Sequence, residues 1–317
     1  MELQRVIAIG FFDGVHRGHG ALLARARQVA DRLGLPAAAV TFDHHPASVL
    51  GGRAVPLLST PEERAGLMVR LYGMDEVLIC PFDRETAQMP WRSYVSDLLH
   101  RQYGAVHVVC GEDHRFGWRG EGDAVRLQQL CTRLGMGCDV IPKVEIGGSA
   151  VSSTRIRALL ERGDVAGANE LLGHPHCLTG RVVHGRQLGR QLGTPTANLL
   201  LPDGVLAPAY GVYATRVWVG ERSYAAVANV GVRPTVDGVG AVTVEPWLLD
   251  FTGNLYDREV RVDFYEFLRP EQKFDGLDQL RQAILLNADQ TRAYFAPREQ
   301  PKVSEFSLYN GENDVIN

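Results

Sequence analysis

The first half of the chain alternates short apolar runs with segments in which apolar residues recur every three or four positions. The apolar runs predict strands, and the periodic segments predict helices. The predicted strands are Val6–Ile9, Ala37–Phe42, Val77–Cys80, Val106–Cys110 and Asp139–Ile141. The predicted helices are Ala21–Leu33, 60–71, Trp91–Gln102, Ala124–Leu134, Thr154–Arg162 and Val165–Leu172. Short apolar strands between helices indicate a Rossmann-like α/β domain, with a parallel sheet covered on both faces.

The helix expected over 60–71 has a clear start signal. Thr60 and Glu63 have the spacing of a capping box, and Pro61 stands at the first helical position. A capping box satisfies two backbone N–H groups that a helix start otherwise leaves unpaired, and proline there costs no hydrogen bond. This helix should therefore begin sharply after Thr60.

The pattern changes near Gly173–His176, where glycine and proline interrupt the apolar periodicity. The runs that follow are rich in β-formers and separated by turn residues, and a final segment is amphipathic at helical spacing. The predicted strands are Leu178–Val183, Gly211–Val219, Tyr224–Val230, Val242–Leu249 and Val260–Leu268, and the final helix is Leu277–Phe295. These features predict a small antiparallel β-barrel domain with a C-terminal helix. We expect two domains, residues 1–174 and 175–317.

Composition narrows the classes of protein. The 317 residues are enough for two cores, and 33 basic against 37 acidic residues give a net charge of -4, which argues against a general nucleic-acid binder. Five cysteines with no CxxC pair argue against a disulfide framework or a structural zinc site. Because the chain shows neither a signal-peptide pattern nor an apolar run of membrane-spanning length, we expect a cytoplasmic protein with no membrane partner.

The stretch GFFDGVHRGHG is the first candidate for chemistry. A predicted strand leads into a glycine-rich turn, and a helix follows, so unpaired N–H groups and the positive end of the helix dipole favour phosphate there. His16 and His19 share a helix face and offer donors to phosphate oxygens during nucleotidyl transfer. The other candidate phosphate-binding residues of this turn are Gly10, Phe12, Asp13, Gly14 and Gly18. Two other readings are a pair of surface histidines and a metal pair, the latter without an obvious third ligand.

The stretch SSTRIR is the second candidate. Ser153 or Thr154 is expected to cap a helix, with Ser152 beside them, and Arg157 projects from the first turns of that helix. Hydroxyls, backbone N–H groups and a guanidinium around one point suit an anion, although capping beside a solvated arginine explains SSTRIR alone. A P-loop is excluded, because none of the three lysines follows a glycine.

The second half holds a different phosphate signature, GRQLGRQLGTPTANL, which includes Gly189. Thr196 and Asn198 are two residues apart in a segment that Pro195 makes extended, so we expect them to face one side and bind a Mg²⁺–phosphate unit, with Thr196 as a metal ligand. Glu245, in TVEPWLLDF, is a candidate general base. The alternatives are a threonine–asparagine turn and an outward-facing strand glutamate.

The first half resembles the FMN adenylyltransferase domain of prokaryotic bifunctional riboflavin kinase/FMN adenylyltransferases, or FAD synthetases, which belong to the HxGH nucleotidyltransferase superfamily. The stretches that carry this resemblance are GFFDGVHRGH, TFDHHP, CGEDHRFGWRGEGD and SSTRIRALLERGDVAGANELLG. The resemblance implies that His16 and His19 contact ATP phosphates and that Ser153 and Arg157 close over them. It also implies that Asp113 lies in a loop that contacts nucleotide or flavin.

The second half resembles riboflavin kinase in GRQLGRQLGTPTANL, AYGVYA, VANVGVRPT, VEPWLLDFTGNLYD and FLRPEQKF. The resemblance implies that Thr196 and Asn198 handle Mg-ATP and that Glu245 activates the riboflavin 5′-hydroxyl. The chain departs from the family pattern at four positions near the two sites. The family commonly has proline, an aromatic residue, an aromatic residue and histidine where this chain has His44, His114, Thr194 and Trp247.

Together the two resemblances imply two consecutive transfers, from riboflavin to FMN and from FMN to FAD, each using ATP with Mg²⁺. The expected partners are these small molecules, with no tightly bound cofactor and no nucleic acid. Two alternatives remain: that one domain is inactive, and that the protein is a flavin- or nucleotide-binding regulator.

Overall fold

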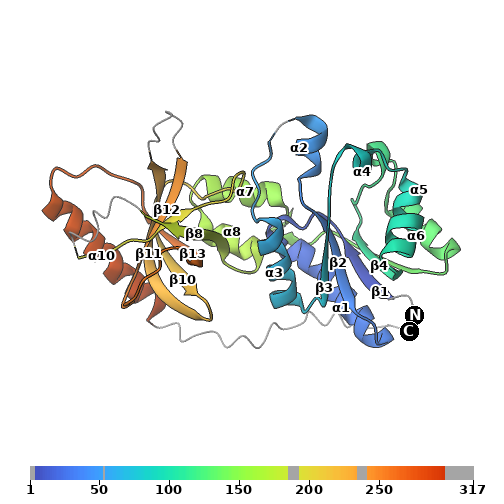
Figure 1. Cartoon of the computed structure of the whole chain (residues 1–317), viewed down its shortest axis with the longest axis horizontal. Helices are drawn as coiled ribbons and strands as arrows, with labels where there is room; N and C mark the ends of the chain where they lie inside the picture. The colour runs from blue at the N-terminus through green and yellow to red at the C-terminus, as the bar shows by residue number, and fades with distance from the viewer. Residues whose placement is uncertain (1–3, 53, 185–192, 234–240, 297–317) are drawn as a thin grey trace.

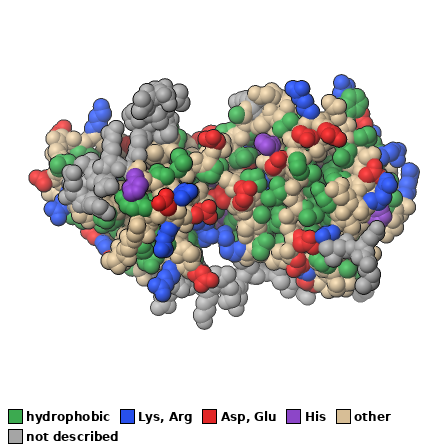
Figure 2. Space-filling view, viewed as in Figure 1, with side chains coloured by type: hydrophobic (Ala, Val, Ile, Leu, Met, Phe, Trp, Pro, Cys, Tyr) green, Lys and Arg blue, Asp and Glu red, His purple; other side chains and the backbone are tan. Residues whose placement is uncertain are grey.

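The computed structural model describes residues 4–52, 54–184, 193–233 and 241–296. A parallel sheet with its helices forms one part of the molecule and a barrel forms the other, with α7 (Ser153–Glu161) and α8 (Val165–Leu172) between them (Figure 1). On the face drawn in Figure 2, basic and acidic side chains are interspersed, as the nearly balanced charge of the chain suggests.

The first part is built on a parallel five-stranded sheet, as the sequence predicts. Its strands are β1 (Arg5–Ile9), β2 (Ala37–Phe42), β3 (Glu76–Cys80), β4 (Ala105–Gly111) and β5 (Gly137–Ile141). Their order is β3-β2-β1-β4-β5, so the chain crosses over after β3 and β1 lies between β2 and β4. Ligands of open α/β sheets bind outside the carboxyl ends of the strands at such a reversal of strand order.

Helices cover both faces of this sheet. Along β1, Val6 and Ala8 pack into the cluster that includes α1 (Arg17–Leu33) and α3 (Pro61–Tyr72). Ile7 and Ile9 point the other way, into the cluster that includes η2 (Tyr94–Gln102) and α6 (Ala124–Arg133). The predicted capping box of α3 is confirmed, because the Thr60 and Glu63 side chains each accept from the other's backbone N–H. The shorter elements are η1 (Asp13–Val15), α2 (Pro46–Gly51), α4 (Arg84–Gln88), α5 (Trp91–Ser93), η3 (Trp118–Gly120), β6 (Glu145–Ile146) and β7 (Ser149–Ala150).

The second part is a closed barrel with strand order β10-β11-β12-β9-β8-β13. Its strands are β8 (His176–Val183), β9 (Asn198–Leu200), β10 (Gly211–Val219), β11 (Arg222–Arg233), β12 (Ala241–Leu248) and β13 (Glu259–Arg269). The sequence pattern predicted five of these and missed β9, whose short pairings with β8 and β12 close the barrel. The predicted C-terminal helix is confirmed as α10 (Leu277–Phe295), which contacts β10 and β11.

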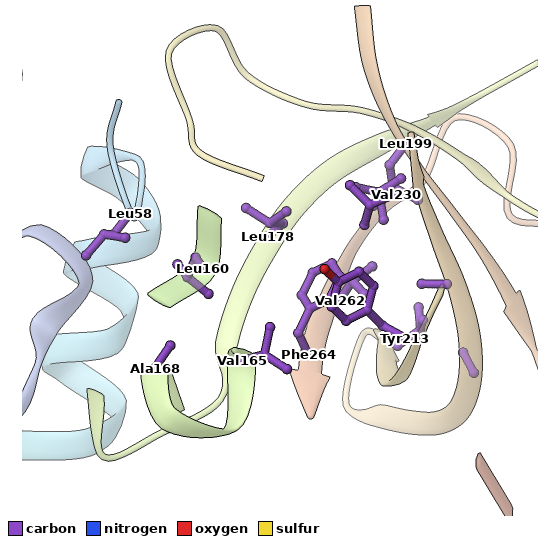
Figure 3. Close-up of a cluster of buried hydrophobic side chains, with 14 of the residues drawn as sticks. Leu58, Leu160, Val165, Ala168, Leu178, Leu199, Tyr213, Val230, Val262 and Phe264 are labelled. Atoms are coloured by element: carbon purple, nitrogen blue, oxygen red, sulfur yellow. The ribbon is translucent and has the colours of Figure 1, made fainter. Parts of the chain in front are cut away.

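The core of the barrel continues into the helices that precede it. Leu160 of α7 and Ala168 of α8 belong to the same buried cluster as Leu178 of β8 and Phe264 of β13 (Figure 3). Asn169 adds a hydrogen bond, since its Nδ2 donates to the Phe264 carbonyl at 2.8 Å. These helices, which come before the sequence change near residue 174, are therefore packed as part of the barrel's core.

Candidate active sites

The first cavity, of about 440 Å³, opens where β1, β4 and β5 end. Its lining comes mainly from the segments that follow these strands and from the start of α1 and α7. The lining residues are Ile9, Gly10, Phe11, Phe12, His16, Gly18, His19, Leu22, Gly111, Glu112, Asp113, His114, Arg115, Ile141, Pro142, Lys143, Val144, Ala150, Val151, Ser152 and Ser153. The sequence motifs GFFDGVHRGH, CGEDHR and SST therefore meet at one place, which is the reversal point of the sheet.

The two motif histidines lie against each other at the start of α1. Their rings are stacked with centroids 3.5 Å apart, and His16 Nδ1 accepts from the backbone N–H of His19 at 3.3 Å. This cap explains why α1 begins at Arg17, four residues before the predicted start. A Cβ on Gly18 would lie 3.1 Å from the His16 ring, so glycine leaves that ring room.

Burial keeps both imidazoles neutral. It lowers the pKa of His16 to about 4, and it holds the pKa of His19 well below its usual value, with the nearby His16 adding to the effect. His19 Nδ1 is buried without a hydrogen-bond partner in the described part of the chain. A neutral imidazole carries one N–H donor, so each ring is able to donate to a phosphate oxygen in the cavity.

Arg157 lies away from the cavity lining. Its Nη2 donates to Asp13 Oδ2 at 2.5 Å, and its Nε donates to the Pro56 carbonyl at 2.7 Å. The buried Asp13 carboxylate is therefore engaged by a guanidinium and does not face the cavity. Ser153 does line it, while its Oγ donates to the Asp13 carbonyl at 3.0 Å.

The remaining predicted residues of this site divide into two groups. Six line the cavity: Gly10, Phe12, Gly18, Asp113, Ser152 and Ser153. Gly14 and Thr154 belong to the turn and to α7 but not to the lining. The cap of α7 is Ser152, which accepts from Arg155 N, so the expectation that Ser153 or Thr154 caps this helix was wrong by one or two residues. Asp113 is 70% exposed and forms an ion pair with Lys143 at 3.4 Å.

His114 is expected to lower the free energy of unfolding of the protein. Its Nε2 is buried without a partner among the described residues, and burial lowers its pKa to about 4. His114→Phe should raise the free energy of unfolding by about 1 kcal/mol at pH 7, because an unsatisfied buried polar group is removed. It should also weaken the loss of stability on acidification. The pKa of this histidine is near 6.5 in the unfolded chain and about 4 in the folded protein. The part of the unfolding free energy that depends on the neutral ring is therefore fully present above about pH 6.5 and is lost as the pH falls toward 4.

Urea unfolding of both proteins at pH 7 and pH 5.5 measures the two effects. The difference in unfolding free energy between the two pH values should be smaller in His114→Phe by about 1 kcal/mol. An equal acid loss in both proteins would show that the His114 ring is not held neutral by the fold.

The second cavity, of about 680 Å³, lies between one side of the barrel and α10. It is lined by Thr194, Thr196, Val212, Val227, Asn229, Glu245, Trp247, Arg269, Glu271, Gln272, Lys273, Phe274, Leu280, Ile284 and Asn287. Glu245 on β12 is the register partner of Asn229 on β11. Its Oε1 accepts from Thr243 Oγ1 at 3.4 Å, and Glu245 is one of the residues that line the cavity.

The structure separates two residues that the sequence analysis placed together. Thr196 is exposed on the cavity lining, whereas Asn198 is buried in β9 and does not line the cavity. The expected common face fails because β9 begins only at Asn198, so Thr196 precedes the strand. Gly189 and most of the GRQLGRQLG stretch lie outside the described residues.

Sequence reasoning missed several polar residues of this cavity. Asn229 Nδ2 donates to Glu271 Oε1 at 3.2 Å, and Arg269 Nε donates to Asn287 Oδ1 at 3.0 Å. A Cβ on Gly231 would lie 2.3 Å from Glu271 Oε1, so a side chain at this position would displace the carboxylate from where it meets Asn229. The signal was present, because Asn229 and Gly231 lie in VANVGVRPT, and Arg269 and Glu271 lie in FLRPEQKF.

Two kinds of feature are absent from the residues that the structure describes. No group of three or more histidine, cysteine, aspartate or glutamate residues there is placed to hold a metal ion. No helix in the same ranges has the length and apolarity needed to cross a membrane.

Comparison with known proteins tests the two resemblances. A family model described as FAD synthetase matches residues 2–155, and one described as riboflavin kinase matches residues 172–295. The curated bifunctional riboflavin kinase/FMN adenylyltransferase of Pseudomonas fluorescens is 40% identical over 92% of this chain and 93% of its own length. The chain belongs to the bifunctional riboflavin kinase/FMN adenylyltransferase family.

Other members of this family are similarly related to the chain. The Escherichia coli K12 protein is 37% identical over 92% of both chains, and that of Listeria monocytogenes is 34% identical over 94% of this chain and 95% of its own. A crystal structure from Streptococcus pneumoniae, described as a macrolide-efflux protein, has a TM-score of 0.81 and 31% identity, and covers 92% of this chain and 95% of its own. The combination of sheet domain and barrel is thus found together in a solved structure.

Proposed function

We propose that this chain phosphorylates riboflavin to FMN in the barrel cavity and adenylylates FMN to FAD in the sheet cavity, using ATP for both. The observation that carries the proposal is the position of the cavities. Each lies within one of the two family matches, and each gathers polar side chains from segments far apart in the sequence.

In adenylyl transfer, a phosphate oxygen of FMN attacks the α-phosphorus of ATP. A new P–O bond forms, the bond from the α-phosphorus to the bridging oxygen of the β-phosphate breaks, and pyrophosphate leaves. Negative charge grows on the phosphate oxygens, and fixed donors stabilise it without a covalent protein intermediate. His16 and His19 supply such donors, and the N-terminus of α1 adds its backbone N–H groups.

In phosphoryl transfer, the riboflavin 5′-hydroxyl attacks the γ-phosphorus of ATP, and ADP leaves. Glu245 accepts the proton of that hydroxyl as general base. Glu245 belongs to β12 and lines the cavity, so a regular strand fixes the position of its backbone. Trp247, two residues further along the same strand, also lines the cavity. Positioning and charge neutralisation supply most of the remaining rate in phosphoryl transfer.

The barrel cavity suits a magnesium ion that arrives with ATP. Magnesium prefers oxygen ligands and is usually held by few protein groups together with substrate phosphates. The cavity offers the Thr196 hydroxyl and the carboxylates of Glu245 and Glu271. Thr196 is the proposed ligand. When bound, the ion would neutralise charge on the transferred phosphoryl group.

The direct test is incubation of the purified chain with riboflavin and Mg-ATP, followed by chromatographic separation of FMN and FAD. Formation of FAD supports both assignments. Accumulation of FMN alone would indicate an inactive adenylyltransferase, and tight flavin binding without either product would indicate a regulator. Assays in which magnesium is omitted or exchanged for another divalent cation test the magnesium proposal. The cytoplasmic location of the protein remains a prediction.

The domain division proposed from the sequence, 1–174 and 175–317, leads to a test of fragments. A fragment from Cys177 would lose the α7 and α8 side chains that pack on Leu178 and Phe264. We expect the fragment 153–317 to unfold cooperatively and form FMN but no FAD. The fragment 177–317 should be several kcal/mol less stable, because it exposes buried apolar surface. Equal urea midpoints for the two fragments would show that the helices add nothing to the barrel.

A further inference from the structure

The 56–60 segment, between α2 and α3, joins the two parts of the molecule. On one side it forms a parallel β-bridge with the 202–206 segment of the barrel half. The Leu57 N–H donates to the Gly204 carbonyl at 2.8 Å, and the Leu206 N–H donates to the Leu57 carbonyl at 2.8 Å. Each segment therefore supplies one donor and one acceptor to the other.

The opposite side of the 56–60 segment holds the turn that leads to His16. The backbone N–H groups of Leu58 and Ser59 donate to Asp13 Oδ1 at 2.9 and 3.2 Å. The buried Ser59 Oγ accepts from the Gly14 N–H at 3.0 Å. The turn itself adopts left-handed backbone at Phe12, where φ is 57°. Such a conformation persists when the surroundings fix it, and here the fixing groups belong to the 56–60 segment.

Side-chain packing reinforces the same connection. Leu58 is 2% exposed and belongs to the cluster that runs through α7 and α8 into the barrel (Figure 3). A Cβ on Gly14 would lie 2.8 Å from Leu58 Cδ1, so the turn packs directly on this side chain. A shift of Leu58 would therefore displace the turn or open a gap beside it.

A second bond crosses between the two parts close by. Glu63, whose Oε2 accepts from Thr60 N in the capping box, also accepts from the Thr179 N–H of β8 at 2.5 Å through Oε1. The end of the 56–60 segment is therefore fixed to the barrel as well as its middle. The HxGH turn thus rests on a segment whose own position is set by the kinase half.

We propose that the 202–206 segment of the kinase half is a positioning element for adenylyl transfer. It holds the 56–60 segment, which holds Asp13 and Gly14 and so places His16 and His19 for the phosphates of ATP. Its effect is exerted through the turn, since neither segment lines the sheet cavity. This inference rests on the proposed adenylyl transfer in that cavity.

Leu206→Pro tests the inference, because it removes the N–H that donates to Leu57. Val205→Ala is the matched control, because it shortens the side chain next to Leu206 and keeps every backbone N–H of the bridge. Formation of FMN from riboflavin, measured on the same samples, reports that the barrel is intact. Formation of FAD from supplied FMN is measured as kcat and KM separately.

For Leu206→Pro we expect kcat for FAD formation to fall by about tenfold or more, since misplaced donors lose transition-state stabilisation. The rate of FMN formation should stay within about twofold of the wild type, and Val205→Ala should match the wild type in both reactions. Amide hydrogen exchange at Leu58 and Ser59 should become faster in Leu206→Pro. Unchanged FAD kinetics in Leu206→Pro would overturn the inference.

Leu57→Pro removes the other hydrogen bond of the bridge from the opposite side and decides the matter if Leu206→Pro does not fold. The same selective loss of FAD formation is expected, and its absence would overturn the inference. The proposed function fails in a different way. A wild-type chain that makes no FAD from FMN and ATP refutes adenylyl transfer itself, whereas an active wild type with active bridge variants refutes only the positioning role.

Discussion

Glu245→Gln should lower the rate of riboflavin phosphorylation by about 10²- to 10⁴-fold, the range typical of a removed general base. The amide preserves the size of the side chain and a carbonyl oxygen that accepts from Thr243, so the fold of β12 should be unaffected. The adenylylation of supplied FMN should persist, since Glu245 lies in the other cavity. The measurement is the initial rate of each reaction with saturating Mg-ATP.

Glu266→Gln serves as the matched control for this substitution. Glu266 is a partly buried strand glutamate on β13 and does not line the barrel cavity. It should retain both activities. If Glu245→Gln and Glu266→Gln phosphorylate riboflavin equally fast, Glu245 is a structural strand residue, and the base must be sought among the other groups of the cavity.

His16→Ala and His19→Ala should each slow FAD formation severely while leaving FMN formation intact. Both rings line the sheet cavity, and the proposed role of each is to donate a hydrogen bond where charge grows in the transition state. Loss of one such donor typically costs about 10²- to 10³-fold in kcat. The rates of the two reactions, measured separately with riboflavin and with FMN as substrate, give the selectivity directly.

His16 also caps α1, so a companion variant must separate capping from catalysis. Asparagine is a good N-cap, and His16→Asn should therefore keep most of the stability that His16→Ala loses. It should still lack most of the FAD-forming activity. A His16→Asn protein with wild-type adenylyl transfer would show that position 16 acts only as a cap. His100→Gln, at a histidine outside the cavity, should change neither reaction.

The sequence predicted the main elements because their signals are local. Apolar runs identified all five strands of the sheet, and the Thr60–Glu63 spacing located the start of α3. Elements fixed by distant partners were missed. β9 has three residues and is a strand only because β8 and β12 lie on either side of it. The start of α1 was misplaced because a histidine, not one of the usual capping residues, caps it.

The candidate sites show the same contrast between features with a local sequence signal and contacts between distant residues. The resemblance of the motifs to the two enzyme families grouped His16 and His19 with Ser153, and Glu245 with Thr196, and the structure places each of these groups on one cavity. The resemblance did not reveal that Asp13 holds Arg157, because the partners are 144 residues apart. Nor did it reveal that Glu271 completes the barrel cavity beside Asn229. Such contacts depend on how the two parts of the chain pack, and no local pattern carries that information.

The shared core of α7, α8 and the barrel has a consequence for how a cell controls the two activities. One polypeptide supplies the two active sites in a fixed one-to-one ratio. A substitution at Ala168 or Phe264 would weaken the core that α7, α8 and the barrel share and so lower the stability of the chain. Quality control degrades whole chains, so such a change would reduce FMN and FAD synthesis together. Selective adjustment of one activity is then expected from changes outside this core, in a cavity or in a segment that positions its residues.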